Sequence, residues 1–165
     1  MAPPNALITR RHITRWVNAS INKHFNSLVG PYLYVWVEGD TRDTREMTDF
    51  AELRIDGPKI QEFSRGWFRI YAEINILVTS SINDTDLYKI HTDTGIVLEA
   101  MQTRIPIFRY GTGVDDDQTL VGCFTLISDS RNSLDVLQLG RKLIETPLMT
   151  SIVEGHYDMK IEMEV

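Results

Sequence analysis

The stretch Trp67 to Thr79, WFRIYAEINILVT, has a hydrophobic pattern of period two along its whole length. Successive side chains of a β-strand point to opposite faces, so every second residue shares a face. One face is apolar throughout and consists of Phe68, Ile70, Ala72, Ile74, Ile76 and Val78. The other face is mixed and consists of Trp67, Arg69, Tyr71, Glu73, Asn75, Leu77 and Thr79. The pattern predicts a strand whose apolar face lies in the core.

The length of this predicted strand needs a reason. Thirteen residues at about 3.3 Å each span about 43 Å, which is about twice the usual strand. One interpretation is a bent strand that wraps around a single core. The other is a strand whose end or outer face meets another subunit. In that case Trp67, Arg69, Tyr71, Glu73 and Asn75 are the candidate interface residues.

Two segments on either side of the strand have apolar residues at spacings of three and four, which is typical of amphipathic helices. The first runs from about Arg10 to Leu28, with Thr9 as a candidate N-cap. The second runs from about Asp86 to Gln102. Gly95 lies inside the second helix, where the absence of a side chain is expected to permit close packing on the sheet.

Further strands are expected from β-branched and aromatic content and from alternation. They are Tyr32 to Val37, Phe50 to Ile55, Lys59 to Phe63, Arg104 to Tyr110, Leu120 to Ser128 and Gly155 to Val165. A turn at Asp56-Gly57-Pro58 separates the second from the third. We expect the first strand, which is apolar on both faces, to be central or covered. The fourth is interpreted as an edge strand or a strand start because of Pro106, and the fifth is expected to be buried.

Two segments near the C-terminus have weaker signals. Ser130 to Glu145 is ambiguous, because its leucines allow a short helix that Gly140 could end. Pro147 to Glu154 is interpreted as a connector before the final strand.

Helices and strands occur without a regular βαβ alternation, so the sequence predicts the α+β class. We expect a mixed, largely antiparallel sheet with one long central strand, flanked by two main helices. The chain of 165 residues is a natural size for a single domain, 1–165. Within it, residues 1–6 are expected to form a flexible N-terminal arm, and residues 39–48 a long polar loop.

Composition excludes several classes of protein. The net charge of −6 argues against a general nucleic-acid binder, which needs a basic surface. No apolar run approaches the roughly 20 residues of a membrane span, and the N-terminus lacks the apolar segment of a secretory signal. Cys123 is the single cysteine, so no intrachain disulfide forms. It lies in an apolar run and is expected to be a buried thiol.

A search for chemistry finds no catalytic motif such as HExxH, CxxC or GxSxG. Asp115 to Asp117 is the densest carboxylate cluster, and it is either a solvated turn or a weak Ca²⁺ site. We therefore predict no catalytic, cofactor-binding or metal-binding residues. The alternative of another class is a small enzyme or ligand-binding domain, with a pocket near His91, Asp93 and Cys123.

Five arginines are further candidates for subunit contacts. Arg10, Arg11 and Arg15 give the first helix a basic character, which fits a solvated face or an acidic partner such as a second copy of this acidic chain. Arg42 and Arg45 lie in the 39–48 loop, which is either flexible or a contact arm that orders on assembly.

Several pieces of the sequence resemble the tail terminator proteins of long-tailed bacteriophages and the related neck proteins of the head–tail junction. The similar pieces are RRHITRWVNASINKHF near the start, WVEG at Trp36 to Gly39, WFRIYAEINILV, LYKIHTDTGIVLEAM at Leu87 to Met101, and VEGHYDMKIEMEV at Val153 to Val165. The similarity covers most of the chain by the order of its elements. Ser130 to Glu145 and the 39–48 loop have no counterpart in it.

The resemblance implies a structural virion protein of the tail or neck, assembled in the host cytoplasm. Such proteins form a homo-oligomeric, hexameric ring that caps the tail tube, stops its polymerisation and joins the tail to the head. The implied partners are the tail tube protein and a head–tail connector or neck protein. DNA passes through the lumen without specific binding, and no membrane, catalysis or cofactor is implied. A head-completion or other neck protein is the alternative within the same class.

Overall fold

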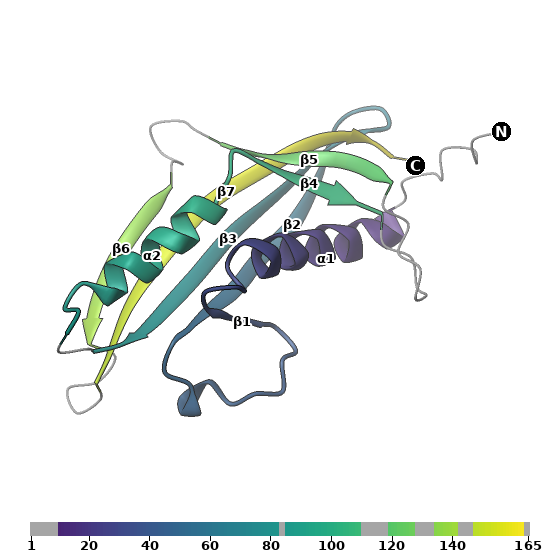
Figure 1. Ribbon diagram of the computed structural model, residues 1–165. Helices are drawn as coiled ribbons and strands as arrows, with labels where there is room; N and C mark the ends of the chain where they lie inside the picture. Colours follow the sequence, from purple (N-terminus) through teal and green to yellow (C-terminus); the bar gives the residue numbers. More distant parts are fainter. Residues whose placement is uncertain (1–9, 83–84, 110–118, 128–133, 142–146, 164–165) are drawn as a thin grey trace.

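The structure is a computed structural model that describes residues 10–82, 85–109, 119–127, 134–141 and 147–163 (Figure 1). Its elements are α1 (Arg10–Leu28), β1 (Tyr34–Val37), the 3-10 turn η1 (Thr44–Glu46), β2 (Phe50–Ser64), β3 (Trp67–Ser81), α2 (Lys89–Ala100), β4 (Arg104–Phe108), β5 (Leu120–Leu126), β6 (Asp135–Arg141) and β7 (Leu148–Glu162). The predicted arm at 1–6, the candidate cap Thr9 and the Asp115–Asp117 cluster lie outside the described residues.

The strands form one seven-stranded sheet in the order β1-β2-β3-β7-β5-β4, and β6 also pairs with β7. The β1–β2 pair is parallel, and the other pairs are antiparallel. Both helices lie on the same face of this curled sheet, as Figure 1 shows. The predicted α+β class with a mixed, largely antiparallel sheet is confirmed.

The strand β3 pairs with a neighbour on each side. Its register with β7 is unbroken from Trp67 opposite Glu162 to Ser81 opposite Leu148. On its other side it pairs with β2 from Ser64 to Phe50, with two register shifts. The detail of one long central strand is not confirmed, because β2, β3 and β7 all have 15 residues.

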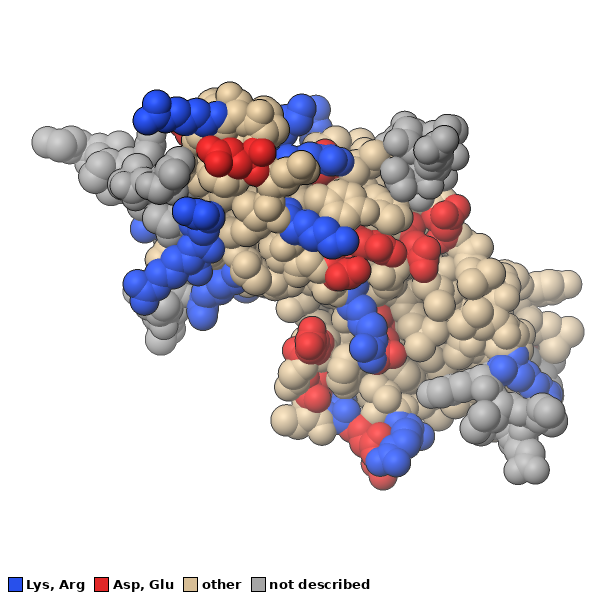
Figure 2. All heavy atoms as spheres, turned by 180° about the vertical axis from the view of Figure 1, so that it is seen from behind, with Lys and Arg blue, Asp and Glu red and all other residues tan. Residues whose placement is uncertain are grey.

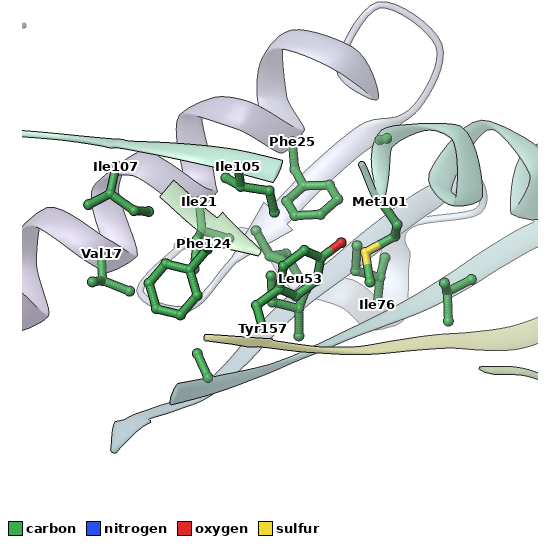
Figure 3. Close-up of a cluster of buried hydrophobic side chains, with 14 of the residues drawn as sticks. Val17, Ile21, Phe25, Leu53, Ile76, Met101, Ile105, Ile107, Phe124 and Tyr157 are labelled. Atoms are coloured by element: carbon green, nitrogen blue, oxygen red, sulfur yellow. The ribbon is translucent and has the colours of Figure 1, made fainter. Parts of the chain in front are cut away.

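The apolar face predicted for β3 lies in the core. Burial alternates along the strand, and Phe68, Ile70, Ala72, Ile74, Ile76 and Val78 are all buried. Side chains from both helices and the other strands close over them, and Figure 3 shows part of this cluster, with Phe25 of α1, Met101 after α2 and Tyr157 of β7. The hydroxyl of Tyr157 donates to the carbonyl of Gln102 at 2.9 Å, and burial raises the pKa of this phenol. The polar atom of this large core residue is therefore satisfied.

The predicted turn at Asp56-Gly57-Pro58 is wrong. The chain continues through it as one strand, β2, and the three residues form a β-bulge between Asp56 and Lys59 in the register with β3. Gly57 has φ +116°, a conformation that side chains other than glycine rarely adopt. Glycine and proline are turn signals, but they also mark bulges, and only the partner strand separates the two cases.

Two further corrections concern the C-terminal third of the chain. The segment predicted as a connector, Pro147 to Glu154, is mostly strand, since β7 begins at Leu148. The ambiguous segment Ser130 to Glu145 contains the strand β6 in its described part. Glycine at 140 has φ +72° and lies at a register shift against β7, so it bends a strand instead of ending a helix.

The positions of three elements in the sheet differ from expectation. The strand β1 was expected to be central or covered; it is not central, because it lies at one end of the strand order, and of its four residues only Val35 is fully buried. At the opposite end β4 is an edge strand, as Pro106 predicted. The strand β5 was expected to be buried, yet only Phe124 is fully buried, and Cys123 is partly exposed.

The helix α2 is shorter than predicted, and Gly95 does not mediate close packing. A Cβ atom built at Gly95 meets no atom within 4 Å, whereas one built at Gly155 on β7 lies 2.5 Å from Met101 Cε and 3.1 Å from Leu134 and Tyr157. The close approach that we assigned to the helix is therefore made by the strand beneath its C-terminal end.

This geometry predicts opposite effects for two glycine substitutions. Gly95→Ala is expected to stabilise the protein by about 0.5–1 kcal/mol, because alanine has the higher helix propensity and its methyl group has room. The matched change Gly155→Ala is expected to destabilise it, because Met101 must move. The free energy of unfolding from denaturant titration measures both. Destabilisation by Gly95→Ala would contradict the open space at that position.

Candidate functional site

The sheet face opposite the two helices, which we call the open face, carries the mixed residues of β3. Register places Arg69 beside Gln61 and Lys160, and Tyr71 beside Lys59 and Asp158. Figure 2 shows basic and acidic side chains interspersed over this side of the molecule. Since no helix of the described chain covers it, the open face is the candidate functional surface.

One cluster on the open face lies toward the β2–β3 hairpin. Arg69 Nε donates to Asp158 Oδ2 at 2.8 Å, and the Tyr71 hydroxyl is hydrogen-bonded to Nδ1 of His156. The ring of Tyr71 also lies between two cations, with Lys59 Nζ at 5.8 Å and Arg69 Cζ at 5.6 Å from its centroid. Burial, and then the charge of Glu73, raise the pKa of Tyr71, so it stays a neutral hydrogen-bonding group.

A depression of about 210 Å³ lies in this cluster and is lined by Lys59, Gln61, Arg69 and Tyr71. It is smaller than the roughly 300–1,000 Å³ of typical small-molecule sites. Its polar lining offers an ammonium, a guanidinium and an amide, all of which donate hydrogen bonds. The arrangement is suited to a single carboxylate or similar anionic group.

A second cluster on the open face lies toward β1. Arg42 stacks on the ring of Tyr34 with its Cζ at 4.4 Å from the centroid, and the Trp36 indole donates to the Arg42 carbonyl at 3.2 Å. The hydrogen bond from Tyr34 to Asp40 lowers the pKa of that carboxyl, and the backbone N–H of Arg42 adds to the effect. These contacts fold part of the 39–48 loop back onto the sheet.

The predicted interface residues fall into three groups. Trp67, Arg69, Tyr71, Glu73, Asn75 and, through the loop, Arg42 share the open face. Arg10, Arg11 and Arg15 lie on α1, on the helix side of the sheet. Arg45 turns back to Asp43, with Nη2 to Oδ2 at 2.8 Å, and this hydrogen bond lowers the pKa of the Asp43 carboxyl. The structure does not bring the three groups together.

Sequence reasoning missed Lys59, Gln61, His156 and Asp158 as members of the open face. The alternation of the C-terminal strand already placed Asp158 and Lys160 on its polar side. What the sequence lacked was the pairing of β7 with β3, which sets Asp158 opposite Tyr71. Lys59 was missed because the turn predicted at Asp56-Gly57-Pro58 separated Lys59 to Phe63 from the strand before it.

A third polar cluster, partly buried, lies where α2 begins. Lys89 Nζ donates to Asp49 Oδ1 and to Asp93 Oδ2, each at 2.7 Å, and Ser80 Oγ donates to Asp93 Oδ2 at 2.6 Å. Asp49 also accepts from the backbone N–H of Ser81 at 3.0 Å. The Lys89 clamp, as we call these five residues, thus ties the end of β3 to α2 and to the segment before β2.

The clamp holds Asp49 and Lys89 in their charged forms. Burial raises the pKa of Asp49, but the hydrogen bonds from Lys89 and Ser81 outweigh it, so the net pKa lies below its ordinary value of 3.8. Burial lowers the pKa of Lys89, but the bonds to Asp49 and Asp93 outweigh it, and the net pKa lies above 10.5. A lysine that stays protonated is no general base, so we interpret the clamp as structural.

We expect Lys89→Met to reduce the free energy of unfolding at neutral pH by about 2 kcal/mol, because it leaves the buried Asp93 without its ammonium partner. The pKa of Asp49 is lower in the folded protein than its ordinary value of 3.8. Its charged carboxylate therefore contributes to the free energy of unfolding above pH 3.8, and this contribution is lost as the pH falls below that value. The difference in the free energy of unfolding between Lys89→Met and the parent protein should therefore become smaller at acid pH.

Lys59→Met is the matched control, because Lys59 is exposed on the sheet surface, and its expected effect is below about 0.5 kcal/mol. Urea titrations between pH 3 and pH 8 measure both variants. Equal losses for the two variants, or a loss at Lys89 that does not depend on pH, would contradict the clamp.

The residues of the alternative enzyme site do not converge. Asp93 turns inward to Ser80 and Lys89, while His91 is exposed and lies within 3.5 Å of Gln138. Cys123 lies on β5 opposite Pro106. Among the described residues, no group of three or more His, Cys, Asp or Glu side chains is placed to hold a metal ion. Within the same ranges, no helix is both long and apolar enough to span a membrane.

Comparisons with known proteins bear on the fold. No protein-family model and no curated protein matches the sequence. One solved structure, which carries no functional name, is similar over 92% of this chain and 97% of its own, with a TM-score of 0.53 and 10% identity. At this identity the similarity shows that the α+β architecture occurs in another protein, and it says nothing about activity.

Proposed function

We propose that this protein is the subunit of a ring-forming tail terminator of a long-tailed bacteriophage. The ring caps the tail tube, stops its polymerisation and joins the tail to the head. The proposal rests on the sequence resemblance and on one observation, the open face of a sheet whose other face is covered by both helices. In the ring, β3 is the strand from which the contact between subunits is built.

The hairpin end of the open face has the composition of a contact surface. Trp67 is 43% exposed although it belongs to a strand that is paired on both sides, and Phe63, whose ring centroid lies 5.5 Å from Lys160 Nζ, is exposed as well. Tryptophan and other aromatic residues are enriched at the centres of protein interfaces. Burying one such side chain is worth about 1.5–3 kcal/mol, and a ring repeats that gain at every contact.

The charges of the open face suit a neighbouring copy of this acidic chain. The depression between Lys59 and Arg69 offers donors for a carboxylate, and the net charge of the chain is −6. A ring requires two different patches on each subunit, one for each neighbour. The open face supplies one patch, and Arg10 and Arg11 on the opposite side of the sheet belong to a second one.

The proposed partners follow from this role. They are further copies in a hexameric ring, the tail tube protein on one side, and a head–tail connector or neck protein on the other. DNA passes through the lumen without specific binding, because a chain with a net charge of −6 does not supply a basic track for phosphates. The protein functions in the virion after assembly in the host cytoplasm, with no cofactor and no catalytic step.

Replacement of Trp67 tests the proposed contact between subunits. Trp67→Ser is expected to weaken ring formation by about tenfold or more at each contact, since about 1.4 kcal/mol corresponds to a factor of ten. The control is Tyr32→Ser, because Tyr32 is more exposed but precedes the sheet at the end of the α1–β1 turn. Light scattering at micromolar concentration, with and without a tail tube protein, gives the mass. Only 19.0 kDa species under both conditions would count against the ring.

A second measurement addresses termination itself. Tube protein that polymerises alone should give tubes of unlimited length, and addition of this protein should stop growth and leave it at one tube end. Electron microscopy of the tubes measures length and position. If growth continues but heads leak DNA in particles that lack the protein, a neck function replaces the terminator.

A further inference from the structure

A second pocket, which we call the α1–β4 pocket, lies between α1 and the edge strand β4. Figure 1 shows the helix running beside this strand. The pocket has a volume of about 310 Å³ and is lined by residues of α1, of β4 and of the segment between α2 and β4. This volume reaches the lower end of the roughly 300–1,000 Å³ of typical small-molecule sites. The pocket shares no lining residue with the depression on the open face, so it is an independent candidate site.

Four polar residues of α1 line the pocket and lie on one face of the helix. Ser20, Lys23, His24 and Ser27 are three or four positions apart, and residues at these spacings are neighbours on a helix surface. A helix face that packs against a sheet is normally apolar. A polar face at this place is what a site for a polar ligand group requires.

Hydrogen bonds hold the walls of the pocket in place. The N–H of Phe108 donates to Ser20 Oγ at 2.9 Å, which ties α1 to β4. His24 Nε2 donates to the carbonyl oxygen of Ala100 at 2.8 Å, because a carbonyl oxygen only accepts, and this bond ties α1 to the C-terminal end of α2. A pocket whose walls are fixed beforehand loses little conformational freedom when a ligand binds.

The edge of β4 does not accept a further strand beside the pocket. The N–H of Phe108 is already bonded to Ser20, and Pro106 has no N–H. An extended peptide binds a sheet edge through main-chain hydrogen bonds, so these two residues prevent that mode of binding. A compact ligand between α1 and β4 needs no such bonds. The pocket therefore suits a small molecule better than a polypeptide segment.

The polar part of the lining favours a negatively charged group. Lys23 contributes an ammonium, Ser27 a hydroxyl and Gln102 a side-chain amide, and all three donate hydrogen bonds. Among the residues that line the pocket, none is acidic. One ammonium balances the single charge of a carboxylate, whereas a phosphate monoester carries a charge of about −1.5 to −2 at neutral pH. A carboxylate is therefore the anion that matches this lining.

The rest of the lining is apolar. It consists of Leu28 at the end of α1 and of Pro106 and Phe108 on β4. Leu28 is 36% exposed, and the other two side chains are partly exposed. An apolar ligand group that covers these side chains removes them from water, which favours binding. A ligand with a charged end and an apolar body uses both parts of the pocket.

We propose that the α1–β4 pocket binds a small carboxylate with an apolar body, of the size of a monocyclic aromatic acid. The ammonium of Lys23 and the neutral donors of Ser27 and Gln102 bind the carboxylate. The apolar side chains of α1 and β4 contact the body of the ligand. The site does not depend on the contact between subunits on the open face, and it exists whether or not a ring forms.

The first test compares three probes on the full chain by isothermal titration calorimetry. Phenylacetate has both features, phenylacetamide lacks the charge, and acetate lacks the apolar body. Phenylacetate should bind with a dissociation constant on the order of 1 mM or lower, and the other two about tenfold more weakly or less tightly still. If phenylacetate does not saturate the protein, or if either of the other probes binds as tightly, the proposal is overturned.

The second test removes the ammonium. Lys23→Met should weaken the binding of phenylacetate about tenfold or more, because it removes a charge-assisted hydrogen bond. Lys59→Met is the matched control, since it removes an ammonium from the depression on the open face, and it should change the affinity by less than about twofold. Equal losses in the two variants, or a loss in Lys59→Met alone, would refute binding at the α1–β4 pocket.

The third test fills the pocket and keeps the charge of Lys23. Ser27→Phe should abolish the binding of phenylacetate, because its ring occupies the space of the ligand. Asn26→Phe is the matched control and should leave binding unchanged, because Asn26 is exposed on the same helix but does not line the pocket. Circular dichroism checks that both variants are folded. Binding that survives Ser27→Phe, or that is lost equally in both variants, contradicts the location of the site.

Discussion

The pairing of β3 with its two neighbours determines where every other element lies. Because the alternation of β3 is strict, one face of the central three strands is continuously apolar and must be covered. The two helices cover it, α1 near β4 and the start of β2, and α2 over β3 and β7. The residues that alternate with these apolar side chains lie on the opposite face of the sheet. The open face therefore exists because of the same period-two pattern that builds the core.

The polar interactions have different roles at the two ends of β3. At its C-terminal end, Lys89, Asp49 and Asp93 are partly or fully buried and stabilise the position of α2. At its N-terminal end, Arg69 and Asp158 pair near the surface, where an ion pair contributes little to stability and can be exchanged for contacts with a neighbour. One strand thus carries a structural site and a candidate contact site.

The parts of the fold that the sequence predicted well are those with a strong local period. The bounds of α1 and the inward face of β3 were both correct, because thirteen or more residues of consistent periodicity leave little choice. The bulge in β2 and the strand β6 were missed, since Gly57-Pro58 and Gly140 carry turn signals that pairing with β3 and β7 overrides, and β7 was predicted only from Gly155 onward. Of the open face, the sequence predicted the residues on β3 and Arg42. Its other members, Lys59 and Asp158, come from strands whose neighbours no local pattern specifies.

The ladder around β3 also has a mechanical meaning. The strand β3 is paired with β7 over all its 15 residues and with β2 from Trp67 to Thr79, so it bends only together with its neighbours. The two ends of β3, Trp67 on one side and Ser80 and Ser81 on the other, therefore belong to one rigid strand. A bound partner that tilts the β2–β3 hairpin would therefore also displace the other end of β3, where α2 packs, about 45 Å away. The domain can therefore transmit a displacement from one end of β3 to the other without a hinge between them.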